Sequence, residues 1–471
     1  MEVDTLNIEQ NIKHAGSWSN KHMWKLAFVA LITLILMIPV AWISSIIRER
    51  YNRKTSVIEE IAGKWGGSQI VSGPILSIPY SVKVKSTTDD GKELITEVDK
   101  YIHIAPDSIR VQGKVETVMH QRGIFKVTGY KAALDIKASF APYAVDNPAY
   151  SELPLRWNDA LLCFDINDQR GMKEIKGDAN GAPLVFNRSE GVLSIISLPE
   201  TANLKDTFSA YKGDAQEKQE QNFKLEAKVP VDNRAEAITI NIKTTISGTQ
   251  QLNFASSALS ESVNLEGDWQ SPSFIGDLLP ESRTVNAEGF KASWHTSNLN
   301  NGIKKTWTSD EPTLQLSNLG VNFLIMVDNY QQTTRSLKYS VLFLLLTFMT
   351  FFFAEIMTRQ RIHPIQYLMV GFGLLIFYLL LLSISEHIAF AWSYLIAASG
   401  VILQISLYCY SILKTRRFAL QVASLLSFLY IFLYVLLRLQ DSALLIGSIS
   451  LFVLLSLAMY IIRNVNWYSQ D

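Results

Sequence analysis

The candidate functional residues of this chain are ionisable groups that lie beside long apolar runs. Glu386 and His387 are neighbours in "SISEHIAF", which joins two such runs. A histidine next to a carboxylate titrates near neutral pH, so the pair is a candidate for proton handling or ligand binding. Two alternatives remain open. Glu386 caps the next helix within a plain loop, or the pair contacts the rest of the protein and holds a domain in place.

Three further ionisable residues complete the set of candidates. Glu355 in "FFFAEIMTRQ" lies near the end of an apolar run. An ionisable group within a membrane helix is costly, and it marks a functional candidate by default. The alternative for Glu355 is an ion pair with Arg359, four residues further along the helix. His363 and Asp441 lie in the short polar segments "RIHP" and "RLQDS".

No familiar catalytic signature accompanies these residues. The sequence lacks a Gly-x-Ser-x-Gly elbow, a His-Glu-x-x-His motif and a Walker phosphate loop. Cys163 lies in the charged part of the chain and Cys409 in an apolar run, and neither has Cys or His neighbours at metal-ligand spacing. We therefore expect no metal, no cofactor, no disulfide and no enzymatic activity.

Six apolar stretches are long enough to position these residues in a membrane, because about 20 helical residues cross about 30 Å of hydrocarbon. They are approximately Trp24–Ile47, Leu337–Met357, Tyr367–Ser385, Phe390–Leu413, Phe418–Leu437 and Ala443–Ile462. No small-residue cleavage site follows the first stretch, which predicts an uncleaved signal-anchor. Apolar periodicity predicts that this helix continues to about Lys64, where Gly66 and Gly67 stop it.

Charge divides the chain into two parts and predicts its orientation. The chain from Ser336 onward has eight Lys/Arg and four Asp/Glu, whereas the preceding part has 35 and 39. Basic residues cluster in "TRQRIHP" and in "KTRR", and Arg463 follows the last stretch, which predicts that these segments are cytoplasmic. The basic cluster from Arg48 to Lys54 opposes this orientation, but the later segments agree with one another. The predicted parts are a cytoplasmic tail over 1–23, a transmembrane signal-anchor over 24–47, an extracytoplasmic domain over 48–335, a five-helix transmembrane domain over 336–463 and a cytoplasmic tail over 464–471.

The large domain between the first two apolar stretches has the pattern of β-structure. "GIFKVTGYKAALDIKASF" and "AITINIKTTISGTQQLNF" alternate apolar and polar residues, which places one face in a core and the other in water. Turn clusters such as "TTDDGK" and "GDANGAP" separate the strands. The sequence thus predicts an α+β membrane protein with six transmembrane helices and a mostly β, antiparallel domain of one or two sandwich-like cores.

Three long segments resemble one known family. They are "WGGSQIVSGPILSIPY", "KYSVLFLLLTFMTFFFAEIMTRQRIHPIQYLMVGFGLLIFYLLLLSISEHIAF" and "LYVLLRLQDSALLIGSISLFVLLSLAMYIIRNVNWY". Together they are similar to the CreD family of inner-membrane proteins. The resemblance implies a multi-pass protein of the bacterial inner membrane, tied to cell-envelope integrity and to tolerance of colicins and some β-lactams, with no established catalytic residues. At Gln440-Asp441-Ser442 the family pattern has two acidic residues and a tyrosine, so this chain departs from it there.

Three classes of function fit these observations. The first is a non-enzymatic envelope protein whose periplasmic β domain binds a partner protein or envelope polymer. The second is a transporter or channel-like protein, which would require facing polar groups within the helices. The third is a membrane enzyme that uses Glu386 and His387. Of these we expect the first, with the lipid bilayer and an envelope component as partners and no nucleic acid.

Overall fold

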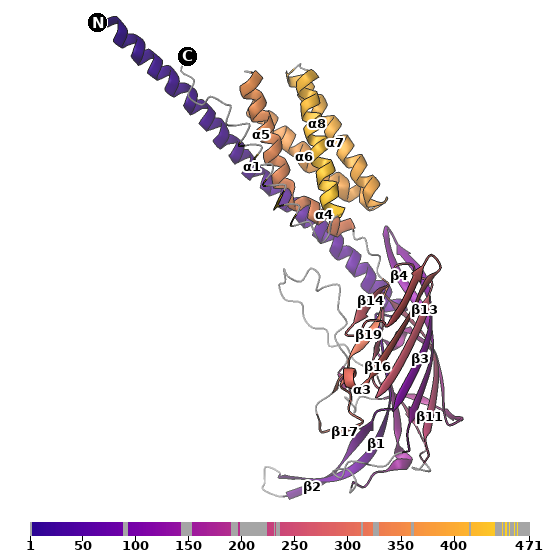
Figure 1. The fold of residues 1–471 in the computed structure, drawn as a ribbon. Coiled ribbons are helices and arrows are strands. Elements are labelled where there is room, and N and C mark those ends of the chain that lie inside the picture. The colour runs from indigo at the N-terminus through magenta and orange to yellow at the C-terminus, as the bar shows by residue number, and fades with distance from the viewer. Residues whose placement is uncertain are drawn as a thin grey trace. The chain divides into compact units, whose positions relative to one another are not determined.

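The computed structural model of the chain divides into two compact units (Figure 1). It describes residues 2–87, 93–142, 153–189, 196–197, 224–229, 231, 236–311, 314–323, 329–358, 362–413 and 416–438, with a few residues between 445 and 459. The helical unit comprises Met1–Lys54 and Val327–Asp471, and the β unit comprises Thr55–Met326. Helix α1 (Glu2–Trp65) contributes residues to both. The predicted α+β class with a large β-rich domain is confirmed.

The β unit is built from strands of very different length. Its described elements are β1 (Gln69–Thr87), β2 (Glu93–Ile104), β3 (Ser108–Arg122), β4 (Phe125–Phe140), η1 (Trp157–Asp159), β5 (Leu161–Ile166), η2 (Gln169–Gly171), β6 (Met172–Ala179), β7 (Ala182–Leu184), β8 (Phe186–Ser189), β9 (Ile196–Ser197), β10 (Lys224–Lys228), β11 (Ile238–Thr249), β12 (Gln251–Ala255), β13 (Ser260–Gly267), β14 (Ser273–Gly276), β15 (Ser282–Asn286), β16 (Gly289–Ser297), α3 (Asn298–Asn301), β17 (Thr306–Thr308), β18 (Leu314–Gln315) and β19 (Asn318–Asn322).

Over the described residues these strands form two large sheets and one small one. The nine-stranded sheet follows the order β14-β19-β12-β1-β5-β10-β8, with β2 added to β1 and β17 to β2. The eight-stranded sheet follows the order β15-β16-β13-β3-β4-β11-β6-β7, and β9 pairs with β18. The prediction of antiparallel pairing is wrong at three places among the described strands, because β1 pairs with β12, β3 with β13 and β9 with β18 in parallel. These partners are far apart in the chain, so long connections join them instead of hairpins.

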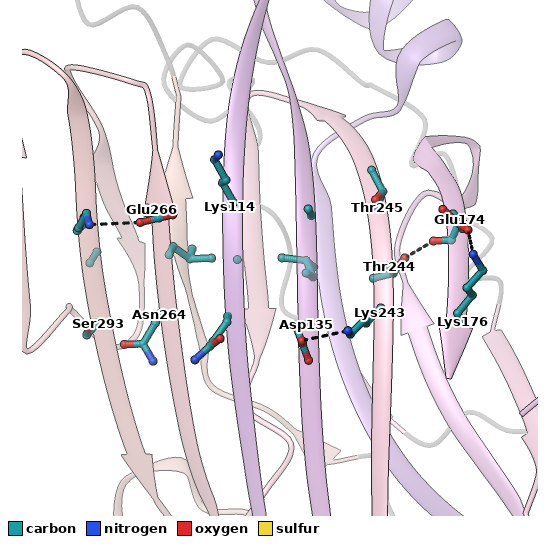
Figure 2. Close-up of a pocket in the computed structure, with 17 residues that line it drawn as sticks. Lys114, Asp135, Glu174, Lys176, Lys243, Thr244, Thr245, Asn264, Glu266 and Ser293 are labelled. Atoms are coloured by element: carbon teal, nitrogen blue, oxygen red, sulfur yellow. Dashed lines mark hydrogen bonds and ion pairs between the residues drawn. The ribbon is translucent and has the colours of Figure 1, made fainter. Parts of the chain in front are cut away.

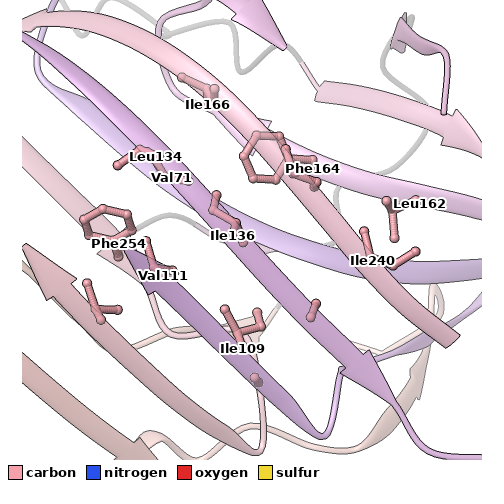
Figure 3. Packing of buried hydrophobic residues seen from close by; sticks show 14 of the residues in the cluster. Val71, Ile109, Val111, Leu134, Ile136, Leu162, Phe164, Ile166, Ile240 and Phe254 are labelled. Carbon is pink, nitrogen blue, oxygen red and sulfur yellow. The ribbon is translucent and has the colours of Figure 1, made fainter. Parts of the chain in front are cut away.

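The two large sheets enclose a shared apolar core (Figure 3). Val71 and Phe254 come from the nine-stranded sheet, and Val111 and Ile136 from the eight-stranded sheet. On β3 buried and exposed side chains alternate from Ser108 to Glu116, the period of a strand with one face in a core. The other face of this part of β3 therefore meets solvent, which makes it a candidate surface for binding.

The "WGG" motif fixes the end of α1 to the β unit. The helix ends at Trp65, as predicted, and Gly66 adopts a φ of +124°. A Cβ at Gly66 would lie 2.5 Å from the backbone oxygen of Ser247, so only glycine fits this close approach. The backbone N–H of Gly67 donates to Asp168 Oδ2 at 2.8 Å. Burial would raise the pKa of Asp168, but hydrogen bonds from Arg170 and from the Gly67 N–H outweigh it and lower this pKa.

The helical unit contains the amino-terminal part of α1 together with α4 (Asn329–Lys338), α5 (Ser340–Thr358), α6 (Pro364–Ser385), α7 (Phe390–Leu413) and α8 (Arg416–Arg438). Among the described residues, four helical segments are long and apolar enough to cross a membrane, and a pair bent by 43° between α4 and α5 makes a fifth. They correspond to the first five predicted stretches. The sixth, Ala443–Ile462, lies almost wholly outside the described residues, so the six-span arrangement stays a prediction.

A glycine and a group of aromatic rings hold the helices of this unit together. A Cβ at Gly371 on α6 would lie 2.3 Å from Leu36 Cδ1 on α1, so the two helices approach closely at this position. Further along α6, Phe377 packs against Tyr430 of α8 with ring centroids 4.6 Å apart. The hydroxyl of Tyr394 on α7 donates to the backbone oxygen of Tyr430 at 2.6 Å. These contacts fix the helices that carry the predicted membrane candidates.

Candidate functional site

A hollow on the described part of the β unit lies across the solvent-facing side of the eight-stranded sheet (Figure 2). It has a volume of about 810 Å³ and crosses β16, β13, β3, β4, β11 and β6. Strands in a sheet lie about 4.8 Å apart, so six strands span roughly 24 Å. The hollow is therefore long enough to accommodate an extended molecule.

Strand register arranges the exposed side chains of this hollow in two parallel rows. The first row is Ser293, Asn264, Gln112, Asp135, Lys243 and Lys176, and the second is Lys291, Glu266, Lys114, Ala133, Thr245 and Glu174. Each residue lies opposite the next on the neighbouring strand. None of the 17 residues that line the hollow is aromatic. The hollow thus offers charges, amides and hydroxyls rather than an apolar pocket or a stacking platform.

Most charges in the two rows are already paired across strands. Lys243 Nζ lies 4.0 Å from Asp135 Oδ2, and Lys291 Nζ lies 3.4 Å from Glu266 Oε2. Lys176 pairs with Glu174 on the same strand. These three ion pairs are solvent-exposed, so each contributes little to stability.

Lys114 is the exception among the charges of the hollow. Within the described part of the chain it forms no ion pair, and Figure 2 draws no interaction to it. Its neighbour on β4 is Ala133, whose methyl group leaves space beside the lysine. The hollow therefore presents an unpaired cation next to an unfilled position, which suits an anionic group of a ligand.

Glu386, the first of the candidates from sequence, ties the helices of its own unit together. Its side chain is only 10% exposed at the carboxyl end of α6. The hydroxyl of Tyr330 on α4 donates to Glu386 Oε1 at 3.0 Å, and Arg50 Nε of α1 lies 3.9 Å from the same oxygen. Asn329 Nδ2 also donates to the backbone oxygen of Ser385 at 2.6 Å. The arrangement is that of a carboxylate that positions three helices.

The two histidine candidates differ from Glu386 in their surroundings. The side chain of His387 is exposed, and among the described residues it makes no side-chain hydrogen bond. His363 is the N-cap of α6, where its Nδ1 accepts from the Ile365 N–H at 3.3 Å. Gln366 Oε1 accepts from the His363 N–H at 2.9 Å, which completes a capping box. His363 thus starts a helix, and His387 is not brought into contact with it.

Glu355 and Asp441 complete the predicted set. The hydroxyl of Tyr367 on α6 donates to Glu355 Oε2 at 3.5 Å, so this acid has a partner on a neighbouring helix. Arg359, its expected partner, lies outside the described residues, as does Asp441. Among the described residues no group of three or more His, Cys, Asp or Glu could hold a metal ion.

A hydroxyl and an imidazole of the kind used in nucleophilic catalysis meet inside the β unit. Ser77 Oγ lies 2.8 Å from His103 Nδ1 and 3.4 Å from Cys163 Sγ. Ser77 is 0% and His103 1% exposed, and the imidazole packs against Trp307 with centroids 5.5 Å apart. A substrate cannot reach this hydroxyl, so the arrangement serves packing rather than catalysis.

Glu261 on β13 is a second buried group that the sequence did not single out. It is 3% exposed, and its Oε2 accepts from the Ser257 N–H at 3.1 Å. Burial raises the pKa of Glu261 to about 7, although hydrogen bonds from Ser256 and from the Ser257 N–H oppose the shift. Folding therefore depends on the protonation state of this acid.

Sequence reasoning missed Lys114, Ala133 and Glu261 because their significance depends on strand register. The alternation along β4 indicated which of its residues face solvent, but not which residues face one another across strands. The available signal was the run "SIRVQGKVE", whose polar positions recur every second residue with two basic side chains among them.

Comparisons with known proteins give one family. A family model described as "Inner membrane protein CreD" matches residues 21–468. The inner membrane protein CreD of Escherichia coli K12 is 30% identical over 462 residues, which cover 95% of this chain and 94% of that protein. A crystal structure of a candidate nutrient-binding protein from Legionella pneumophila aligns with 50% of this chain and 74% of its own length, at 10% identity and a TM-score of 0.26. A TM-score this low supports no inference about fold or function.

Proposed function

The chain belongs to the CreD family of inner membrane proteins, and from this premise we propose that it supports the integrity of the bacterial cell envelope without catalysing a reaction. Its β unit lies in the periplasm and binds an envelope component in the hollow of the eight-stranded sheet. Both chain termini lie in the cytoplasm, as the basic segments between the apolar stretches indicate. Loss of this binding lowers tolerance of envelope stress, including colicins and some β-lactams.

The observation that carries this proposal is the chemistry of the hollow. It is long, polar and open to solvent, and it contains an unpaired lysine beside a small alanine. Such a surface binds an extended polar partner, because its side chains offer hydrogen-bond donors and acceptors in two regular rows. The enzyme alternative has less support, since Glu386 accepts a hydrogen bond from Tyr330, while His387 is exposed and makes no side-chain hydrogen bond among the described residues.

Crosslinking in living cells tests the proposal. A photoreactive amino acid at Gln112, within the hollow, is expected to capture a specific envelope component. The same amino acid at Lys126, an exposed position on β4 outside the hollow, serves as the control and is expected to capture none. Ala133→Trp fills the hollow from an exposed position, so it should abolish capture and lower envelope tolerance at normal protein levels.

Two results would contradict the proposal. Equal capture from Gln112 and Lys126 would show that the hollow has no special role. Wild-type envelope tolerance of Ala133→Trp would show that the hollow is not needed for the function of the protein. Exposed positions such as these change stability by only about 0.5 kcal/mol, so misfolding is not expected to confuse the assay.

A further inference from the structure

Two cations face each other directly beside the hollow of the eight-stranded sheet. Arg110 on β3 and Lys137 on β4 are opposite one another in register, and both side chains are exposed. Within the described residues neither forms an ion pair or a side-chain hydrogen bond. Like charges directly opposite on a sheet are destabilising. A fold that retains such a pair on an exposed face gains nothing in stability from it, which points to a role in binding.

Lys114 extends this pair into a strip of three unpaired cations. Arg110, Gln112 and Lys114 are successive exposed residues of β3, so Arg110 and Lys114 lie about 14 Å apart along the strand. The acids beside the strip already have other partners, since Asp135 is paired with Lys243, and Glu266, opposite Lys114 on β13, is paired with Lys291. The strip of Arg110, Lys137 and Lys114 therefore keeps its positive charge available for a ligand.

The residues that line the adjacent hollow exclude several classes of ligand. Nucleic acid bases and sugar rings stack on aromatic side chains, and the lining contains none. Membrane surfaces require apolar side chains that insert between lipids, whereas the neighbouring side chains that line the hollow here are Gln112, Asn264 and Thr245. The amides and hydroxyls of this surface can form hydrogen bonds with a peptide backbone, and the unpaired cations can bind carboxylate side chains.

The geometry points to an acidic peptide in extended conformation, and we propose that this strip is its binding site. The peptide lies along β3 and crosses the hollow only at Gln112 and Lys114. Its carboxylates four residues apart meet Arg110 and Lys114, because both chains rise about 3.4 Å per residue. Lys137 contacts the first carboxylate from the other side. This inference rests on the proposed function of the hollow and deepens it by naming the class of partner.

Fluorescence anisotropy with the full-length protein in detergent micelles tests the proposal. The probe is a labelled, end-blocked heptapeptide of glycine and serine with glutamates at its second and sixth positions. We expect saturable binding that weakens as salt is raised, since exposed charges are screened. The same peptide with glutamines is expected to bind at least about tenfold more weakly, because it loses the charge-assisted hydrogen bonds.

Lys137→Glu separates a binding defect from a folding defect. The variant should lose at least about tenfold in peptide affinity, while its unfolding temperature stays the same or rises because the repulsion with Arg110 is replaced by attraction. Lys126→Gln on the same strand is the matched control, and it should bind as the wild type does. Undiminished affinity in both Lys137→Glu and Arg110→Gln would overturn the proposal.

Two further results separate the class of partner from the proposed function. If an oligomer of galacturonic acid binds more tightly than the glutamate peptide, the carboxylates belong to a polysaccharide and the peptide proposal is wrong, while the role of the hollow stands. If the peptide binds as expected but cells with Lys137→Glu keep wild-type envelope tolerance, the binding site stands and the proposed envelope function fails.

Discussion

The carboxyl end of α6 and the exposed face of the eight-stranded sheet both carry charged groups, but these groups differ in what they contact. Glu386 is mostly buried and binds a hydroxyl of α4 and a guanidinium of α1. Arg110, Lys137 and Lys114 are exposed and, among the described residues, form no ion pair. A charge with several fixed partners positions structural elements, whereas a cation that the fold leaves unpaired remains available to a ligand. Glu386 was recognised from its position between two apolar runs of the sequence. The cations of the sheet were recognised only from the strand register, which places them side by side.

The largest expected effect concerns Glu261, a buried acid that forms no ion pair among the described residues. Its folded pKa of about 7 lies above the ordinary 4.5, so the protonated form is favoured in the native state. The resulting stabilisation is fully present below pH 4.5 and is lost as the pH rises through about 7. It amounts to at most about 3 kcal/mol, at 1.36 kcal/mol per pKa unit. Glu261→Gln should remove this pH dependence in chemical unfolding of the whole protein.

Glu266→Gln is the matched control for that measurement, because Glu266 lies on the same strand with its side chain exposed. Its unfolding should retain the wild-type pH dependence. If Glu261→Gln also retains the wild-type pH dependence, the buried acid does not govern the stability of the β unit. The comparison between buried acids that stabilise the fold and exposed cations that bind a ligand would then be weaker.

A smaller effect is expected from overfilling the contact at Gly371. Gly371→Leu should destabilise the helical unit by about 1–3 kcal/mol, because the new side chain collides with Leu36 of α1 and Phe348 of α5. Thermal unfolding in detergent measures the change. Gly400→Leu on α7 is the control, since nothing lies within 4 Å of a Cβ at that position. Equal losses in both variants would mean that the close approach of α1 and α6 does not stabilise the unit.

The hydrogen bond between Tyr330 and Glu386 should contribute about 1–2 kcal/mol. Tyr330→Phe removes the donor and Glu386→Gln removes the charge, so a double-mutant cycle gives their interaction energy. His387→Asn, beside Glu386 but exposed, should leave stability unchanged. A zero interaction energy, or a large effect of His387→Asn, would favour a functional role for the pair over a positioning role for Glu386.

The smallest effect is expected for the paired lysines of the hollow. Lys243→Gln removes an exposed ion pair with Asp135 and should change the free energy of unfolding by no more than about 0.5 kcal/mol. It should also change peptide affinity much less than Lys137→Glu does. If Lys243→Gln loses as much peptide affinity as Lys137→Glu does, paired and unpaired cations on this face contribute equally to binding, which contradicts the prediction.

The sequence predicted the architecture well wherever the pattern was local. Alternation predicted the strands β4 and β11, apolar length predicted the helices α6, α7 and α8, and the glycines after Trp65 predicted the end of α1. The parallel pairings of β1 with β12 and of β3 with β13 could not be predicted, because they join segments more than 140 residues apart.

The same limit applied to the candidate site. Glu386 stood out as an acid between apolar runs, but its partners Tyr330 and Arg50 come from distant helices. Arg110 and Lys137 are ordinary surface residues until register places them opposite one another. Burial of Glu261 likewise depends on the loop of Ser256 and Ser257, which supplies its hydrogen bonds.

The alternation along β3 has a consequence for how this protein can evolve. Ile109, Val111 and Val115 face the core, while Arg110, Gln112 and Lys114 between them face solvent. Substitutions at the solvent-facing positions can therefore change what the surface recognises without disturbing the fold. Insertion of one residue would exchange the two sets, placing cations in the core and aliphatic side chains in water. Relatives of this protein should thus diversify at alternate positions of β3 while the length of the strand stays constant.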